Sequence, residues 1–100
     1  MNVGIINYGV GNLGSVYRAL MNLDVNPVLI KNPKDIYNFD SIILPGVGNF
    51  KKCKLLLDDL GWSSQIQEAI LSKKTPILGI CLGMQLLADY GHEGIVNNDF

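Results

Sequence analysis

The sequence has few charged residues and no excess of either sign. Charged side chains make up 17% of its 100 residues, and the formal net charge is −1. Soluble domains usually carry ~25% charged residues. A charge balance so close to zero provides no electrostatic footprint for nucleic acid or for an anionic membrane surface. Because 48% of the residues are hydrophobic, the chain is also too apolar for a disordered tail. We therefore expect a folded domain that binds neither nucleic acid nor membrane.

Cysteine and histidine are scarce, and long apolar runs are missing. The two cysteines, Cys53 and Cys81, do not make a disulfide framework, and the single histidine is His92. The longest uncharged stretch near the C-terminus, residues 75–88, is interrupted by glycine and glutamine. It is shorter than the ~18 apolar residues of a membrane span. A signal peptide would require basic residues near the N-terminus, but no basic residue precedes Arg18. We expect a cytoplasmic protein, and its residues suggest no cofactor or metal.

Glycine, by contrast, is abundant, with 11 residues against the ~7% usual in proteins. Short apolar runs alternate with segments of helical periodicity. They predict strands at 3–6, 27–30, 41–44 and 76–80, and helices at 13–23, 50–60, 62–71 and 82–90, the last ended by Gly91. Such alternation indicates a parallel sheet covered on both faces, a doubly wound, three-layer α/β fold. The sheet is truncated after four strands, so we expect residues 1–100 to be the N-terminal part of one domain.

The first glycine cluster, Gly9-Val10-Gly11-Asn12-Leu13-Gly14, is a literal G-x-G-x-x-G between a predicted strand and a predicted helix. This pattern is typical of dinucleotide binding, but two of its requirements are missing. No acidic residue stands ~20 positions further on, and two residues separate the strand from the first glycine. A tight strand-to-helix loop is therefore favoured, while a non-catalytic nucleotide-binding module stays open.

A second cluster, Gly46-Val47-Gly48, follows the third predicted strand. In open α/β sheets, ligands bind outside the carboxyl ends of the strands, and the backbone N–H groups of this turn can face that crevice. Such donors suit a developing oxyanion. A turn without a binding role explains the same residues equally well, because proline and glycine both favour turns.

The third cluster, Gly79-Ile80-Cys81-Leu82-Gly83, is the most specific. A G-x-nucleophile-x-G pattern between a strand and a helix is that of the nucleophile elbow, here with cysteine at its centre. The flanking glycines relieve crowding, and the N-terminus of the following helix favours a thiolate. The N–H of Leu82 is then an oxyanion donor, and Gln85 shares the helix face of Cys81 and could present its amide to a substrate. A buried structural cysteine is the alternative for Cys81 and the expectation for Cys53.

A thiol nucleophile needs a general base, which is usually histidine. His92 stands at the far end of the last predicted helix, about ten residues or ~15 Å from the elbow. We expect it to be exposed and uninvolved. These residues therefore supply a nucleophile and an oxyanion hole without a base.

Residues 78–87, Leu-Gly-Ile-Cys-Leu-Gly-Met-Gln-Leu-Leu, resemble the cysteine elbow of class I, or triad-type, glutamine amidotransferases. Residues 5–13 and 44–50 extend the resemblance over nearly the whole chain. It implies the flavodoxin-like fold of that family and hydrolysis of glutamine through a glutamyl thioester on Cys81. It also implies roles for five more residues: an oxyanion hole from Val47 and Leu82, and substrate binding by Gly46, Gly48 and Gln85.

The resemblance narrows to the amidotransferase subunits of imidazole glycerol phosphate synthase, which act in histidine biosynthesis. It implies that ammonia passes to a (β/α)8-barrel cyclase subunit and that the loop with Asn7, Gly11 and Asn12 faces this partner. The family's triad His and Glu stand beyond the last residue of this sequence, so the chain alone is expected to be inactive. Gly14 stands where the histidine-pathway members usually carry arginine, and Asn49 stands where alanine is common. A paralogue that feeds ammonia to surface-sugar amination, or a docking module without catalysis, is therefore an alternative.

Overall fold

The computed structural model describes residues 1–93, apart from the side chains of Leu82 and residues 89–93; residues 94–100, with the polar end expected there, lie outside the described residues. The strands are β1 (Asn2–Ile6), β2 (Asn26–Ile30), β3 (Ser41–Gly46) and β4 (Ile77–Cys81). The helices are α1 (Leu13–Met21), α2 (Phe50–Asp59), α3 (Trp62–Glu68) and α4 (Leu82–Glu93), with a 3-10 segment η1 (Pro33–Asn38) and a π-helical segment η2 (Ala69–Lys73). Within residues 1–93, no helix is long and apolar enough to cross a membrane.

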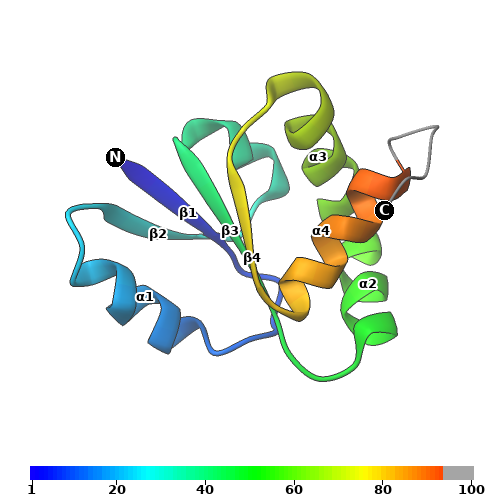
Figure 1. Cartoon of the computed structure of the whole chain (residues 1–100), viewed down its shortest axis with the longest axis horizontal. Helices are drawn as coiled ribbons and strands as arrows, with labels where there is room; N and C mark the ends of the chain where they lie inside the picture. The colour runs from blue at the N-terminus through cyan, green and yellow to red at the C-terminus, as the bar shows by residue number, and fades with distance from the viewer. Residues whose placement is uncertain (94–100) are drawn as a thin grey trace.

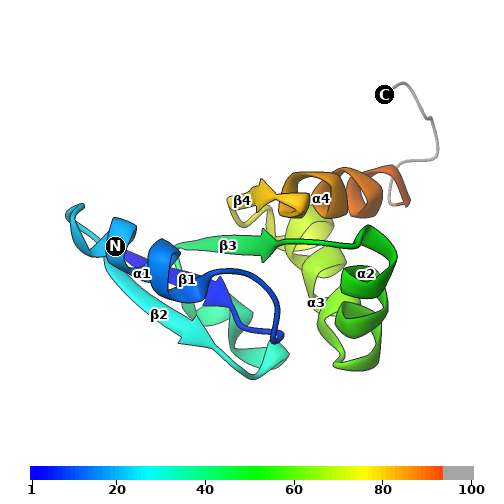
Figure 2. The same cartoon turned by 90° about the horizontal axis from the view of Figure 1, so that it is seen from below.

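The strands form one parallel sheet in the order β2-β1-β3-β4. α1 covers one face of this sheet, and η1, α2, α3 and α4 cover the other (Figure 1). The expected doubly wound, three-layer α/β fold is thus confirmed, and the strand order is that of flavodoxin-like folds. All strands point the same way (Figure 2), so the loops after β1, β3 and β4 gather at one rim of the sheet.

Asparagine side chains cap the N-termini of two of the helices at this rim. Oδ1 of Asn12 accepts a hydrogen bond from the N–H of Ser15 at 3.2 Å, and Oδ1 of Asn49 accepts one from the N–H of Lys52 at 3.1 Å. Each bond satisfies one of the N–H groups that a helix start leaves without an intrahelical partner. The starts of α1 and α2 are therefore fixed by the residue that follows each glycine loop.

The larger part of the core lies between the sheet and the helices α2, α3 and α4. Leu57, Trp62 and Ile66 are almost completely buried there against Ile42 and Leu44 of β3. Burying an apolar side chain of this size contributes roughly 1.5–3 kcal/mol. A smaller cluster fills the space under α1. The core thus anchors β3, whose carboxyl end reaches the rim where the loops after β1, β3 and β4 gather.

The outer strands are less buried than the sequence predicts. Val28 and Leu29 in β2 are 37% and 39% exposed, and Leu78 in β4 is 60% exposed. Their continuous apolar runs predict burial on both faces. β2 and β4 are the outer strands of the described sheet, and α1 is the one described helix on that face. The prediction is wrong for these two strands because periodicity does not reveal how much of a face is covered.

Two helical segments also differ from the sequence-based expectation. α4 runs through Gly91 to Glu93 instead of ending at the glycine, which costs a helix about 1 kcal/mol relative to alanine. η1 is not predicted at all. Its start is capped by Asn32, which accepts a hydrogen bond from the N–H of Lys34 at 3.0 Å, and Ile36 is fully buried. The connection between β2 and β3 is therefore a packed element.

Candidate active site

Cys81 is the last residue of β4, and α4 begins at the next residue, so no loop separates them. The backbone of Cys81 has φ +57°, in the left-handed region that residues with side chains rarely adopt. Holding a residue there costs of order 1–3 kcal/mol, and such strain is concentrated at functional sites. The Cys81 side chain is exposed. The strained turn that the motif predicts is present, and the alternative of a buried structural cysteine is wrong for Cys81.

Glycine is required on both sides of this turn. A Cβ at Gly83 would overlap the carbonyl oxygen of Leu44 in β3. A Cβ at Gly79 would overlap the backbone of Gly83 and come within 2.6 Å of the amide nitrogen of Met84. These neighbours are backbone atoms, so no side-chain rotation relieves the collision. The two glycines let α4 begin directly against β3 and β4.

The turn after β3, residues 46–48, lies beside the elbow because Gly46 pairs with Cys81 in the ladder between β3 and β4. Val47 is 49% exposed, and Gly48 has φ +81°. Within residues 1–93, the N–H groups of Val47 and Gly48 donate to no backbone acceptor. Donors of this kind are satisfied by solvent or by a ligand.

The loop after β1 is built around side chains that bond to nearby backbone. Oδ1 of Asn7 accepts from the N–H two residues on, at 3.3 Å, and Asn12 caps α1. Gly11 has φ +105°, and a Cβ there would come within 3.0 Å of the Cβ of Pro45. The loop is therefore the tight strand-to-helix connection that the sequence favours, and it packs against the turn after β3.

Tyr8 joins this loop to the turn after β3 by a hydrogen bond. Its side chain is 3% exposed, and its hydroxyl donates to the carbonyl oxygen of Pro45 at 2.6 Å. Sequence reasoning assigns Tyr8 no role. The signal that could reveal it is an aromatic residue just after a buried strand, because a buried tyrosine hydroxyl needs a partner.

The three glycine-containing segments meet at a cavity of about 210 Å³. It is lined by the residues around the carboxyl ends of β3 and β4 and the start of α1, namely Gly11, Asn12, Ser15, Val16, Pro45, Gly46, Val47, Ile80 and Cys81. In doubly wound sheets, ligands bind where the chain switches from one face to the other, here between β1 and β3. The cavity is smaller than the ~300–1,000 Å³ of drug-sized ligand pockets, so it favours a small substrate over a dinucleotide.

Other predicted site residues stand around this cavity rather than in it. Gly48 lines a neighbouring cavity of about 410 Å³, and Val47 lines both. Gln85 is exposed on the first turn of α4 and lines neither. Asn7 also lines neither, whereas Leu82 is described by its backbone alone. The structure therefore brings Cys81 together with Gly46, Val47, Gly11 and Asn12, and leaves Gly48, Gln85 and Asn7 outside that cavity.

Comparison with known proteins decides the family. Residues 4–99 match the family model of class-I glutamine amidotransferases. The chain belongs to this family. It is 47% identical over 93 residues to imidazole glycerol phosphate synthase subunit HisH of Methanopyrus kandleri, covering 93% of this chain and 46% of that protein. It is 46% identical over 91 residues to the subunit of the same name from Geobacillus, covering 91% of this chain and 43% of that protein. The chain thus spans about half the length of these curated relatives.

A solved structure shares the fold. The crystal structure described as that of a glutamine amidotransferase superposes with a TM-score of 0.68, covering 81% of this chain and 42% of that chain. The two sequences are 18% identical. This likeness shows that the amidotransferase fold is present, and it carries no information about substrate.

Cys81 is the one titratable group that lines the smaller cavity of this amidotransferase chain. Among the described residues, no histidine or carboxylate lines this cavity. His92 falls in α4, and its side chain lies outside the described ones. Among the side chains that the structure describes, no three His, Cys, Asp or Glu residues cluster to hold a metal ion.

Gly14, the third glycine of the G-x-G-x-x-G pattern, makes no close approach to a strand. A Cβ there would come nearest to the guanidinium of Arg18, at 3.2 Å. In dinucleotide-binding folds this glycine lets the helix pack closely on the sheet. The lack of a backbone atom among its nearest neighbours and the small volume of the Cys81 cavity count against the nucleotide-binding alternative.

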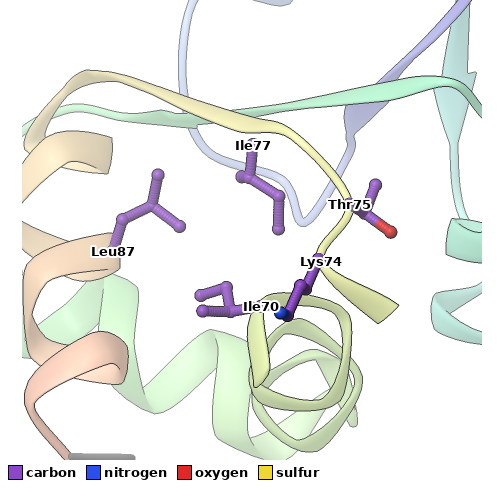
Figure 3. A pocket seen from close by; sticks show the side chains of 5 residues that line it. All are labelled: Ile70, Lys74, Thr75, Ile77 and Leu87. Atoms are coloured by element: carbon purple, nitrogen blue, oxygen red, sulfur yellow. The ribbon is translucent and has the colours of Figure 1, made fainter. Parts of the chain in front are cut away.

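A further cavity of about 360 Å³ lies at the other end of β4 (Figure 3). It is lined by Ile70, Lys74, Thr75, Ile77 and Leu87, which come from η2, β4, α4 and the segment before β4. Its described lining is mainly apolar, and among these residues only Lys74 carries a charge. Among the described residues, no thiol or imidazole lines it.

Proposed function

We propose that this chain is the nucleophile-bearing part of a glutaminase that releases ammonia for a biosynthetic partner. One observation carries the proposal: Cys81, an exposed cysteine with φ +57° at the start of a helix, lines the same cavity as the turn after β3. A strained nucleophile beside unpaired backbone N–H groups is the arrangement that acyl transfer requires.

The reaction begins with attack of the Cys81 thiolate on the side-chain carboxamide carbon of glutamine. A C–S bond forms, and the carbonyl oxygen becomes an oxyanion that accepts hydrogen bonds from the N–H groups of Val47 and Leu82. The tetrahedral intermediate then expels the amide nitrogen, which takes a proton from the general acid and leaves as ammonia. Water hydrolyses the glutamyl thioester, releases glutamate and restores the thiol.

Three further residues are proposed to hold glutamine near the thiol. Gly46 and Gly48 offer backbone groups on either side of Val47, and neither carries a side chain that would fill the space beside it. Gln85 is exposed on the first turn of α4, four residues after Cys81 and so on the same face of the helix. Its side-chain amide can offer glutamine both a hydrogen-bond donor and an acceptor. Gln85 lines neither cavity in this structure, so its contact depends on the bound substrate.

The general base is proposed to come from outside the described residues. The cavity around Cys81 has no second titratable group, and a thiol nucleophile needs a base to accept and return its proton. Residues 1–100 are then the N-terminal part of one amidotransferase domain whose His and Glu triad members are contributed by another segment. Alone, the 100-residue chain is expected to release no ammonia from glutamine.

The proposed acceptor of the ammonia is a (β/α)8-barrel cyclase subunit that makes imidazole glycerol phosphate in histidine biosynthesis, in the cytoplasm. The names of the relatives from Methanopyrus kandleri and Geobacillus support this assignment. The surface offered to the barrel is the loop with Asn7, Gly11 and Asn12. Gly11 and Asn12 also line the cavity of Cys81, so a partner bound at this loop would lie next to the site of ammonia release.

The test is glutamine hydrolysis by the protein expressed from its natural gene, with and without the barrel subunit of the same organism. Cys81→Ser is expected to abolish ammonia release, whereas Cys53→Ser keeps it. Glutamine labelled with ¹⁵N at the amide identifies the acceptor, because label must appear in imidazole glycerol phosphate. Label that enters an amino sugar instead would assign the chain to surface-sugar amination, and full activity of Cys81→Ser would reject the cysteine mechanism.

A further inference from the structure

The second cysteine of the chain contacts the turn that borders the proposed active site. Cys53 lies in the first half of α2, and its side chain is 1% exposed. Its thiol donates a hydrogen bond to the carbonyl oxygen of Val47, with Sγ and O 3.4 Å apart. We infer that Cys53 is a positioning residue for glutamine hydrolysis, because its thiol fixes the Val47–Gly48 peptide of the oxyanion turn. This inference rests on the glutaminase function proposed above.

The geometry of the peptide bond explains how one hydrogen bond can orient the turn. The carbonyl of Val47 and the N–H of Gly48 belong to one planar trans unit, so they point in opposite directions. A bond from Cys53 holds the carbonyl on the side of α2. It therefore keeps a negatively polarised oxygen out of the space where the oxyanion develops, and it restrains the backbone of Val47, whose own N–H is the proposed oxyanion donor.

The cavities on the two sides of the turn agree with this division. Cys53 lines the larger one, together with Gly48, and is not among the residues that line the cavity of Cys81. Val47 lines both, as does Gly11, so the turn borders both cavities. The Cys53 thiol thus contacts the turn beside the larger cavity, and it acts on the oxyanion hole through the backbone.

Packing alone does not hold this peptide in place. Val47 is 49% exposed, and a Cβ built at Gly48 would meet no atom within 4 Å. Gly48 has φ +81°, and glycine adopts other backbone conformations at little cost. Hydrogen bonds hold the segments before and after the turn, at Pro45 and Asn49. The bond from Cys53 acts on the Val47–Gly48 peptide itself.

The competing explanation is that Cys53 only fills space in the core, where a free cysteine behaves as a small apolar residue. The two explanations differ in what they require at position 53. A space-filling residue can be replaced by alanine or valine with a loss of stability alone. A positioning residue needs a donor, so serine should preserve its effect and alanine or valine should not.

The experiment compares Cys53→Ala, Cys53→Val and Cys53→Ser in the protein expressed from its natural gene, bound to the barrel subunit. A thiol is a weak donor, and loss of its bond is expected to lower kcat for glutamine hydrolysis about two- to tenfold in the alanine and valine variants. KM for glutamine is expected to change little, because the orientation of the turn matters for the oxyanion. The serine variant should stay within about twofold of the unsubstituted protein.

Leu57→Val is the matched control, since Leu57 is fully buried one turn further along α2 and does not line the turn. It should lower the stability and leave kcat unchanged. The S–H stretching band of Cys53, read by Raman difference against Cys53→Ala, should be shifted to the low frequency of a bonded thiol. Unchanged kcat in Cys53→Ala and Cys53→Val, equal losses in all three Cys53 variants, or the same loss in Leu57→Val would each overturn the inference. An inactive unsubstituted complex would instead reject the glutaminase function itself.

Discussion

The hydroxyl of Tyr8 donates a hydrogen bond of 2.6 Å to the carbonyl oxygen of Pro45 and ties the loop after β1 to the turn after β3. Both segments line the cavity of Cys81, through Gly11 on one side and Gly46 on the other. The bond spans 37 positions in the sequence and is buried. It shows that the two segments bordering Cys81 are held together by the fold.

Removing this bond should weaken the fold. Tyr8→Phe leaves the aromatic ring in place but deprives a buried carbonyl of its donor, which costs about 1–3 kcal/mol of unfolding free energy. Urea unfolding followed by circular dichroism measures the loss. Tyr17→Phe is the control, because Tyr17 is 37% exposed on α1 and its hydroxyl is not needed in the core. Equal stability of the two variants would contradict the structural role of the Tyr8 hydroxyl.

The elbow glycines should not tolerate even a methyl group. Gly83→Ala drives a Cβ into the carbonyl of Leu44, and we expect a loss of at least about 1–3 kcal/mol in unfolding free energy, as in overpacked cores. Gly14→Ala is the matched control. There the nearest atom is the end of the flexible Arg18 side chain, at 3.2 Å, so the change should be neutral or stabilising by up to about 1 kcal/mol. The same urea measurement compares them, and a fully stable Gly83→Ala would show that α4 is not packed as described.

The two cysteines should differ sharply in reactivity. Cys81 is exposed, whereas Cys53 is buried, so we expect iodoacetamide to alkylate Cys81 at least about tenfold faster in the folded protein. Peptide mass spectrometry over a time course resolves the two sites. The rates should converge in concentrated urea, where both thiols are open to the reagent. Equal rates without urea would mean that Cys81 is not displayed as the elbow geometry indicates.

Gln85 should affect substrate binding rather than the chemical step. If its amide holds glutamine, Gln85→Ala raises KM about two- to tenfold, the value of one lost hydrogen bond, and leaves kcat nearly unchanged. Met84→Ala serves as the control, since Met84 is its neighbour in sequence and is 63% exposed. Steady-state kinetics of glutamine hydrolysis separate the two parameters. A fall in kcat with unchanged KM would contradict a binding role and show that Gln85 acts on the chemical step instead.

The fold is predicted from sequence to a large extent because its signals are local. The apolar runs of β1 and β3 and the periodic segments of α1 to α4 identify the alternation, and the three-layer sheet follows from it. η1 escapes prediction because a short 3-10 segment has no periodicity long enough to detect. The exposure of Val28, Leu29 and Leu78 escapes because the number of helices over a face depends on the whole sheet.

The candidate site, too, is partly predictable from local sequence and partly dependent on the tertiary structure. The elbow around Cys81 is visible in the sequence because its two glycines stand two residues before and two residues after the cysteine. The family match over residues 4–99 agrees with that interpretation. The nucleotide-binding alternative could be weakened from sequence but not dismissed, because the surroundings of Gly14 depend on how α1 lies against the sheet.

By itself, the sequence determined the four strands, the helices α1 to α4 and which thiol stands at a strand-to-helix elbow, since each of these depends on neighbouring residues. Only the tertiary structure decided that the glycine loop, the turn after β3 and Cys81 share one cavity, and that Tyr8 and Cys53 bond the carbonyls of Pro45 and Val47. The physical reason is that a hydrogen bond needs a donor and an acceptor within about 3.5 Å. The packing of the helices on the two faces of the sheet sets those distances, and no local pattern in the sequence encodes them.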